Sequence, residues 1–291
     1  MHGVLLIDKP SGSSSADCVY FLRKVLKTKK IGHCGTLDPL ATGVLPICIG
    51  EATKFSSYIS DQSKEYEVEI SFGVQTTTGD SEGEEIYNKP FMLDEKKLLQ
   101  EVAFFYGEQE QTPPMFSAIK KNGKPLYYWA RKGVYLKRAP RLISISSIDL
   151  LSSSQHQASL RVSCSKGTYI RSLVESIGER LGTKACVSAL RRTRVGEIEN
   201  KSLTLLNVDL KDAYQDKLLP VDHLIKHIQA IHLNQIDAKK IINGQFVDYN
   251  GARQEEGLIR IYTNEGVFVG IGSIDSSKKI SAKRLLSNPL N

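Results

Sequence analysis

Residues 64–72 read KEYEVEISF, and from Glu65 onward polar and apolar side chains alternate without a break. Alternation with a period of two is typical of a β-strand that has one face buried and the other in water. Tyr66 falls on the buried face. There it is either a core residue, which is the commoner case, or a side chain that stacks on a nucleic-acid base at the sheet edge. A half-buried strand of this kind requires a sheet with a covered face.

Apolar runs elsewhere in the chain predict both strands and helices. Further strands are expected at 4–7, 44–49, 143–151, 158–164 and 185–191, and helices at 94–106 and 169–181. The two kinds of element mix without regular strand–helix–strand alternation, so we expect an α+β fold with a largely antiparallel sheet. Short strands at 231–233, 258–262 and 267–271, with a helix near 238–242, predict a small β-rich C-terminal module.

Composition narrows the class of protein only moderately. The 291 residues carry a formal net charge of +7, a mild basic excess that weakly suggests a polyanionic partner. Five cysteines, without a C-x-x-C pair, argue against a disulfide framework or a zinc site. The N-terminal apolar run is too short for a signal peptide, and no stretch approaches the roughly 20 apolar residues of a membrane span. We therefore expect a soluble, cytoplasmic protein.

The segment 32–43, GHCGTLDPLATG, contains three glycines and a proline, and we expect a loop from Ile31 to Gly43. Its single acidic residue is Asp38. The proline that follows restricts the backbone of Asp38, and a fixed carboxylate on a loop suits nucleophilic or base chemistry. The alternative is that the Asp-Pro pair only caps a turn, which is the commoner case for such a pair taken alone.

Residues 165–171, SKGTYIR, lie where a predicted strand meets a predicted helix. Arg171, at the helix start, can pair with a carboxylate through two nitrogen atoms or hold a phosphate; alternatively, it lies on an exposed helix face. His33 is a candidate base, a wedge into bound RNA, or a loop histidine satisfied by hydrogen bonds. A single histidine without partner ligands does not make a metal site, so no metal is expected.

Basic residues gather at 24–30, 120–141 and 191–194. A cluster of like charges is usually a solvated surface. The middle cluster differs, because aromatic residues interleave with its lysines and arginines, a mixture that favours RNA contact. These aromatic residues are Tyr127, Tyr128, Trp129 and Tyr135.

Five segments, read in order, resemble one known family. They are HGVLLIDKPSGSSS at 2–15, GHCGTLDPLATGVLPICIGEATKF at 32–55, KEYEVEISFG at 64–73, PPMFSAIKKNGKPLYYWARKG at 113–133 and CSKGTYIRSLVESIGERLG at 164–182. Together they resemble the TruB family of tRNA pseudouridine synthases, and the similarity runs from about residue 2 to residue 195. Motifs in the family's order and spacing are a specific signal, whereas the C-terminal tail matches only loosely.

The resemblance implies a fold, a substrate and a set of partners. It implies a pseudouridine synthase catalytic domain over residues 1–226, with a mixed, mainly antiparallel sheet, and a small PUA-like RNA-binding domain over residues 227–291. The implied reaction converts uridine to pseudouridine at position 55, in the T loop of tRNA, without a cofactor. We expect a monomer that binds the T arm of tRNA, needs no obligatory protein partner and does not bind membranes.

The resemblance also assigns roles to individual residues. The family's catalytic aspartate, in its G-x-L-D-P segment, falls on Asp38, and the arginine that pairs with it falls on Arg171. The base-stacking tyrosine of the K-x-Y motif falls on Tyr66, and Lys64 of that motif joins the substrate-binding residues. The other substrate-binding positions are His33, which helps to remodel the T loop, the second active-site tyrosine Tyr169, and Leu190.

Making pseudouridine means breaking the N1–C1′ glycosidic bond, turning the uracil and rejoining it through C5. Asp38 can attack C1′ as a glycosidase nucleophile does, or remove the 2′ proton to give a glycal; the sequence is compatible with both. Two rival functions are a hydrolytic RNA glycosidase and a non-catalytic RNA-binding protein, which would not need Asp38, Tyr66 and Arg171 together. Cys34 and Thr36 differ from residues common in the family, but neither change removes a catalytic group.

Overall fold

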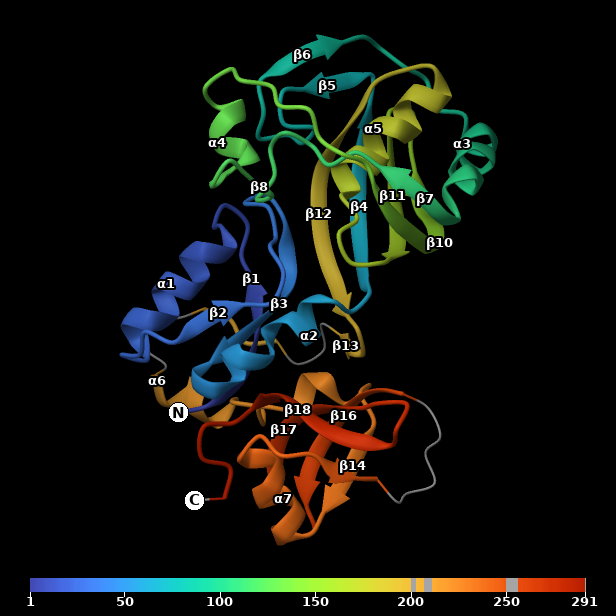
Figure 1. The fold of residues 1–291 in the computed structure, drawn as a ribbon. Helices are drawn as coiled ribbons and strands as arrows, with labels where there is room; N and C mark the ends of the chain where they lie inside the picture. The colour runs from blue at the N-terminus through green and yellow to red at the C-terminus, as the bar shows by residue number, and fades with distance from the viewer. Residues whose placement is uncertain (200–202, 207–210, 250–255, 291) are drawn as a thin grey trace.

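The computed structural model describes residues 1–199, 203–206, 211–249 and 256–290, which form a large sheet with its helices and a smaller C-terminal sheet (Figure 1). Within these residues the large sheet has nine strands, in the order β1-β3-β12-β4-β11-β10-β7, with β2 beside β3 and β13 beside β12. They are β1 Gly3–Lys9, β2 Ile31–His33, β3 Thr42–Ile49, β4 Lys64–Phe72, β7 Gly107–Gln111, β10 Arg141–Ser153, β11 Gln157–Cys164, β12 Ala185–Val195 and β13 Ile198–Glu199.

The large sheet is mixed and mainly antiparallel. Among its described strands only the β3–β12 pair is parallel, and this pair is short, with Thr42 opposite Arg191 and Gly43 opposite Arg192. It joins the part of the sheet formed by β1, β2 and β3 to the part built around β4. The predicted α+β fold with a mixed, mainly antiparallel sheet is confirmed.

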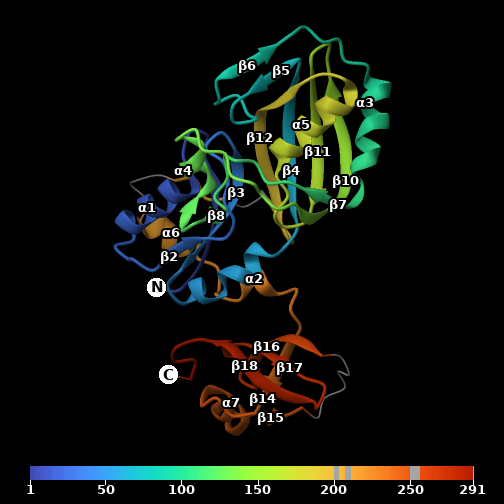
Figure 2. The ribbon, with the colours of Figure 1, turned by 45° about the horizontal axis from the view of Figure 1, so that its top comes forward.

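The strand β4, which is the segment KEYEVEISF, lies between β12 and β11. Tyr66, Val68 and Ile70 are buried in the main core together with side chains of α5 (Ile170–Leu181) and α3 (Glu95–Val102), which pack beside each other on this face (Figure 2). The opposite face is polar, and there Glu67 pairs with Arg161 of β11 at 2.8 Å. The predicted alternation of buried and exposed positions is therefore confirmed.

Helix α1 (Ser15–Val25) packs its apolar residues, such as Leu22, into the same core as Leu5 and Ile47 of β1 and β3. It begins with a capping box in which Ser14 and Asp17 satisfy each other's backbone N–H groups. The other elements of this part are η1 Gly50–Phe55, α2 Ser56–Ser60, β5 Val74–Thr76, β6 Glu85–Asn88, η2 Ala103–Phe105, β8 Lys120–Lys121, β9 Lys124–Pro125, α4 Leu126–Ala130, α6 Lys211–Asp216 and η4 His223–Ile225.

The predicted loop over Ile31–Gly43 is wrong at both ends. Ile31–His33 form β2, with His33 opposite Ile47, and Thr42 and Gly43 already belong to β3. Gly32 is not among the glycines with positive φ, and its hydrogen bonds to β3 outweigh the weak strand propensity of glycine. The short hairpin of β5 and β6 was also not predicted, since its sequences carry too little apolar alternation to mark strands.

The C-terminal sheet has the order β14-β16-β17-β18-β15 within the described residues, and α7 (Gln235–Ile242) packs against it. Its strands are β14 Ala230–Leu233, β15 Val247–Asp248, β16 Gly257–Thr263, β17 Phe268–Ile274 and β18 Lys279–Leu285. The rings of Phe55 and Phe268 lie 5.4 Å apart between the two parts, and Lys54 Nζ donates to the carbonyl oxygen of Leu285 at 3.0 Å. Among the described helices, none has the length and apolar character to cross a membrane.

Gly43 lies at the parallel joint with φ of +100°, and a Cβ atom there would lie 2.2 Å from the carbonyl oxygen of Arg192. We predict that Gly43→Ala lowers the free energy of unfolding by at least about 3 kcal/mol, because a backbone clash adds to the strain of positive φ. The matched control is Gly107→Ala, where φ is +86° and no atom lies within 4 Å. In this control the free energy of unfolding, measured by urea denaturation, should fall by only about 1 to 2 kcal/mol. Equal losses in the two variants would contradict the crowding at the joint.

Candidate active site

The loop that carries Asp38 connects β2 to β3 and is held by a fully buried lysine. The ammonium group of Lys9, at the end of β1, donates hydrogen bonds to the carbonyl oxygens of Pro10, Ser13 and Pro39. These contacts use all three of its donors, and burial lowers the pKa of Lys9. The backbone immediately after Asp38 is therefore fixed from inside the protein.

The carboxylate of Asp38 forms a two-pronged ion pair with Arg171, which lies in the first turn of α5. Arg171 Nε lies 3.0 Å from Asp38 Oδ2, and Nη2 donates to Oδ1 at 3.1 Å. The same guanidinium donates to the carbonyl oxygens of Thr78 and Phe116, both at 2.7 Å, and lies 3.6 Å from Asp80 Oδ2. The Arg171 side chain is 4% exposed and that of Asp38 31%, so a buried cation presents the carboxylate to the cleft.

The surroundings of Asp38 change its acidity. Burial raises the pKa of the Asp38 carboxyl, the Arg171 guanidinium opposes this rise, and the Asp80 carboxylate adds to it. The net direction is upward. A carboxylate with a raised pKa is a stronger base and a better nucleophile than an exposed one, provided that the pH keeps it ionised.

Two cavities meet at Asp38. The first, of about 330 Å³, is lined by Asp38, Lys64, Tyr66, Tyr169 and Leu190. The second, of about 570 Å³, is lined by Asp38, His33 and Arg171 among others. Both cavities share the wall formed by residues 36–38 and 117–118. The structure thus brings all of the predicted site residues around one cleft, and we refer to the two cavities as the Tyr66 cavity and the His33 cavity.

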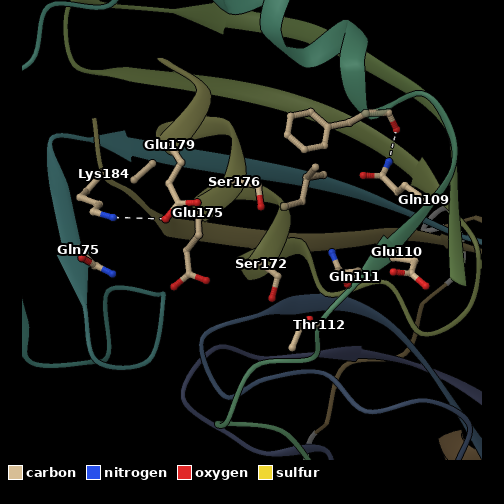
Figure 3. A pocket seen from close by; sticks show the side chains of 13 residues that line it. Gln75, Gln109, Glu110, Gln111, Thr112, Ser172, Glu175, Ser176, Glu179 and Lys184 are labelled. Carbon is tan, nitrogen blue, oxygen red and sulfur yellow. Dashed lines mark hydrogen bonds and ion pairs between the residues drawn. The ribbon is translucent and has the colours of Figure 1, made fainter. Parts of the chain in front are cut away.

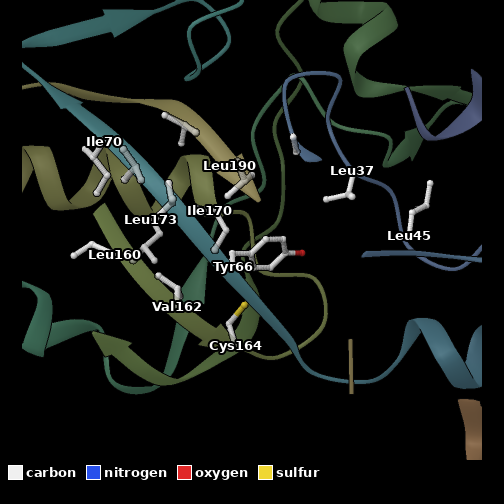
Figure 4. Close-up of a cluster of buried hydrophobic side chains, with 14 of the residues drawn as sticks. Leu37, Leu45, Tyr66, Ile70, Leu160, Val162, Cys164, Ile170, Leu173 and Leu190 are labelled. Carbon is white, nitrogen blue, oxygen red and sulfur yellow. The ribbon is translucent and has the colours of Figure 1, made fainter. Parts of the chain in front are cut away.

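Tyr66 of β4 forms the floor of the first cavity. Figure 4 shows its ring beside Leu190 and Ile170 and its hydroxyl directed away from the apolar cluster. Burial raises the pKa of Tyr66, so the phenol stays protonated at neutral pH. Lys64 precedes it on the same strand and donates to the carbonyl oxygens of Ser60 and Gln62. Burial lowers the pKa of Lys64 to about 8, and so its charge is only partly retained at mildly alkaline pH.

Tyr169 lies at the N-cap of α5 and is held on two sides. The amide of Gln111, at the end of β7, accepts a hydrogen bond from the Tyr169 backbone N–H at 2.7 Å and donates to its carbonyl oxygen at 3.0 Å. The guanidinium of Arg141 lies 4.6 Å from the centre of the Tyr169 ring, in cation–π geometry. The ring is therefore fixed at the edge of the Tyr66 cavity.

His33 lines the second cavity from the end of β2. Burial and, secondarily, the charge of Arg192 lower the pKa of His33, so the imidazole is neutral at neutral pH. Its Nδ1 atom is buried and has no hydrogen-bond partner within the described chain. Tyr127 and Arg131, from the basic segment 120–141, line the same cavity. That segment consequently reaches the cleft that contains Asp38.

Three residues at the site were not singled out from the sequence: Asp80, Gln111 and Arg192. Asp80 lies in the polar loop after β5 and is 4% exposed, beside Arg171. Gln111 and Arg192 make their contacts with segments far away in the chain. Local periodicity carries no signal for such contacts, and only a family-wide comparison of sequences would reveal them.

The basic cluster 191–194 is not a solvated surface. Arg192 is 1% exposed. Its neighbour Arg191 pairs with Asp8 through two contacts, of 3.0 Å and 2.9 Å, and Arg194 lies 3.4 Å from Glu65. Each of these arginines has a partner inside the protein, because β12 lies between β3 and β4 in the sheet and residues of β1, β3 and β4 supply the acceptors. The interpretation of this cluster from its charge alone is corrected accordingly.

A further cavity, of about 340 Å³, lies beside α5 and away from Asp38 (Figure 3). None of the predicted site residues lines it. The carboxylates of Glu110, Glu175 and Glu179 line it together with one cation, Lys184, which pairs with Glu179 at 3.3 Å. The net negative charge of this lining disfavours the phosphates of a nucleic acid. The described part of the chain also contains no group of three or more His, Cys, Asp or Glu arranged to hold a metal ion. The cleft at Asp38 is thus the better candidate site.

Three family models match consecutive parts of the chain. The model described as "TruB family pseudouridylate synthase (N terminal domain)" matches residues 23–170. The model "tRNA pseudouridylate synthase B C-terminal domain" matches residues 171–231, and "Pseudouridine synthase II TruB, C-terminal" matches residues 230–286. The matched regions include the cleft and the C-terminal sheet.

Solved structures are similar in fold. A chain of an H/ACA RNP bound to a substrate RNA containing 2′-deoxyuridine superposes with a TM-score of 0.74 at 23% identity, over 97% of this chain and 84% of that chain. A chain of a Cbf5-Nop10-Gar1 complex gives a TM-score of 0.73 at 25% identity, with the same coverage. The predicted pseudouridine synthase fold is confirmed.

Curated relatives match along nearly the whole length. The tRNA pseudouridine synthase B of Mannheimia succiniciproducens is 40% identical over 99% of this chain and 96% of its own length. The proteins of the same name from Stutzerimonas stutzeri and Cupriavidus metallidurans are 41% and 44% identical, over 98% and 93% of this chain and 96% and 90% of their own lengths. On this evidence the chain belongs to the TruB family of pseudouridine synthases.

Proposed function

We propose that the protein isomerises one uridine in the T loop of tRNA, at position 55, to pseudouridine, with Asp38 as the catalytic carboxylate. The observation that carries this proposal is the carboxylate of Asp38, held at both oxygens by Arg171 where two cavities meet. The name tRNA pseudouridine synthase B, borne by relatives of nearly equal length, supports tRNA as the substrate.

The reaction needs one group that cleaves a glycosidic bond and a site that retains the base. The N1–C1′ bond breaks with its electron pair on the uracil, the base turns, and a C5–C1′ bond forms. The proton lost from C5 is balanced by one gained at N1, so the reaction involves no net oxidation or reduction. Asp38 either forms an ester at C1′ or takes the 2′ proton and later returns it.

The Tyr66 cavity suits a detached uracil. A base stacked on the Tyr66 ring keeps a partner while it turns, and Leu190 supplies an apolar wall. Enclosure by these side chains keeps water from C1′, where it would otherwise hydrolyse the intermediate. Lys64 and Tyr169 would contact the nucleotide at the cavity edge. Retention of the base distinguishes an isomerase from a hydrolase.

The His33 cavity suits the RNA loop from which the uridine comes. A uridine inside a folded loop reaches Asp38 only when it is turned out of its stack. A neutral His33 side chain, with a free Nδ1, can fill the vacated space and form a hydrogen bond there. Tyr127 and Arg131 would contact the rest of the RNA loop. The other cations of segment 120–141 would contact its phosphates.

We also propose a division of labour along the chain. Residues 1–226 form the catalytic domain, and residues 227–291 form a PUA-like domain that adds RNA affinity, since the C-terminal sheet lines neither cavity at Asp38. Contacts such as Phe55 with Phe268 hold the second RNA-binding surface in a fixed position relative to the cleft. The protein would act as a monomer in the cytoplasm, without an obligatory protein partner.

Replacing Asp38 tests the catalytic assignment. We predict that Asp38→Asn lowers the single-turnover rate on an unmodified tRNA transcript at least about 1,000-fold, because the amide is neither a nucleophile nor a base. Binding should be nearly unchanged, since phosphate contacts carry most of the affinity. The matched control is Asp8→Asn, which removes an equally two-pronged aspartate–arginine pair outside both cavities. Near-normal turnover of Asp38→Asn would remove this residue from the mechanism.

Replacing Arg171 tests the ion pair through its effect on pH dependence. Lysine keeps the charge but not the two-pronged contact, so Arg171→Lys should lose about 100-fold in rate. The guanidinium opposes the upward pKa shift of Asp38, so weakening the contact moves this pKa further up. Because the ionised carboxylate is the active form, the rate should begin to fall at a higher pH than in the wild type. If the rate of Arg171→Lys begins to fall at the same pH as that of the wild type, the result would argue against the pairing.

A further inference from the structure

Among the described residues, Arg192 is the largest side chain that is fully buried, at 1% exposure. Its Nε donates to the carbonyl oxygen of Val44 at 2.8 Å, and its terminal nitrogens donate to those of Gly35 and Thr36 at 3.2 Å and 3.4 Å. It lies directly opposite Tyr66 in the register of β12 with β4. Within the described residues it makes no ion pair with a carboxylate. The cation is thus neutralised only by dipoles.

A buried charge without a counter-ion is costly, by several kcal/mol even after relaxation, and therefore calls for a functional reason. Its neighbour in sequence shows the contrast, because Arg191 is 34% exposed and pairs with Asp8. Alternation along β12 places Leu190 and Arg192 on the same face, and both line the Tyr66 cavity. The unpaired cation consequently forms part of the wall of the cavity proposed for the uracil.

The charge of Arg192 reaches the groups around the cavity. Burial lowers the pKa of Lys64 to about 8, and Arg192 contributes to this shift. Burial raises the pKa of Tyr66, and Arg192 opposes that rise. The three carbonyl oxygens that accept from Arg192 have their negative ends engaged with the guanidinium. Among the residues that line the Tyr66 cavity, Lys64, Arg141 and Arg192 are cationic side chains and Asp38 is the single acidic one.

We propose that Arg192 is a positioning residue that stabilises the negative charge on the departing uracil, from its place opposite Tyr66 in the cavity wall and by holding the Gly35–Thr36 segment. This inference rests on the proposed function. When the N1–C1′ bond breaks, the electron pair stays on uracil and its charge spreads to the two ring carbonyl oxygens. A preorganised cation beside Tyr66 lowers the energy of that anion without being consumed, and it loses no proton in the reaction.

The test compares two target nucleosides. Fluorine at C5 withdraws electrons, so 5-fluorouracil leaves as a more stable anion and needs less help from the protein. We predict that Arg192→Met slows cleavage of the target uridine about 100-fold under single-turnover conditions, but that of 5-fluorouridine at the same position only about 10-fold or less. Because fluorine occupies C5 and blocks the last proton transfer, the assay follows loss of the parent nucleoside after nuclease digestion, by mass spectrometry.

Two controls separate charge from packing. Arg191→Met removes the neighbouring arginine and its ion pair and should leave both rates near the wild type. Arg192→Lys keeps the charge but loses the loop contacts, so it should slow both nucleosides by the same factor. Thermal unfolding shows whether Arg192→Met folds. If it does not, the same comparison is made with Arg192→Gln, whose neutral amide can still donate a hydrogen bond to one of the loop carbonyl oxygens.

Equal slowing of the two nucleosides in the neutral variants would overturn the proposal and reduce Arg192 to a structural residue. Failure of the proposed function is a different result, because the wild-type protein would then leave uridine in the transcript unchanged whatever the variants do.

Discussion

The ion pair between Arg171 and Asp38 is the interaction on which the site depends. Its members are 133 residues apart and come from the two parts of the large sheet, one from α5 and one from the loop before β3. Those parts are joined by the short parallel pair of β3 and β12, next to Gly43. The cleft forms at this joint, and the ion pair holds the carboxylate of Asp38 where it lines both cavities.

Three buried cations hold the Asp38 loop from different sides. Lys9 binds the carbonyl oxygen of Pro39, Arg192 binds those of Gly35 and Thr36, and Arg171 binds the carboxylate itself. Backbone dipoles and the carboxylates of Asp38 and Asp80 thus balance most of the positive charge beneath the loop. A site fixed in this way needs little rearrangement as charge develops in the transition state, and this is the main way in which a rigid protein lowers a barrier.

The fold was largely predictable from sequence because its central strand alternates strictly, and Asp38 and Arg171 were identified because their local motifs resemble those of the family. What escaped prediction is non-local. Arg192 belongs to a run of basic residues that looks like a solvated surface, yet burial and alternation on β12 make it part of the cleft. Asp80 sits in a polar loop without a periodic signal, and its ion-pair partner Arg171 comes from α5, far away in the chain.

The central claim is that one cleft, organised around Asp38, isomerises a uridine of a single folded RNA loop. The most direct measurement is incubation of the protein alone with an isolated T-arm stem-loop, followed by site-specific mapping of pseudouridine and mass analysis of RNA and supernatant. The account predicts complete conversion of the T-loop uridine, with RNA mass unchanged and no free uracil. An unmodified stem-loop would show that recognition extends beyond the local loop, and released uracil would show that the site hydrolyses its substrate instead of isomerising it.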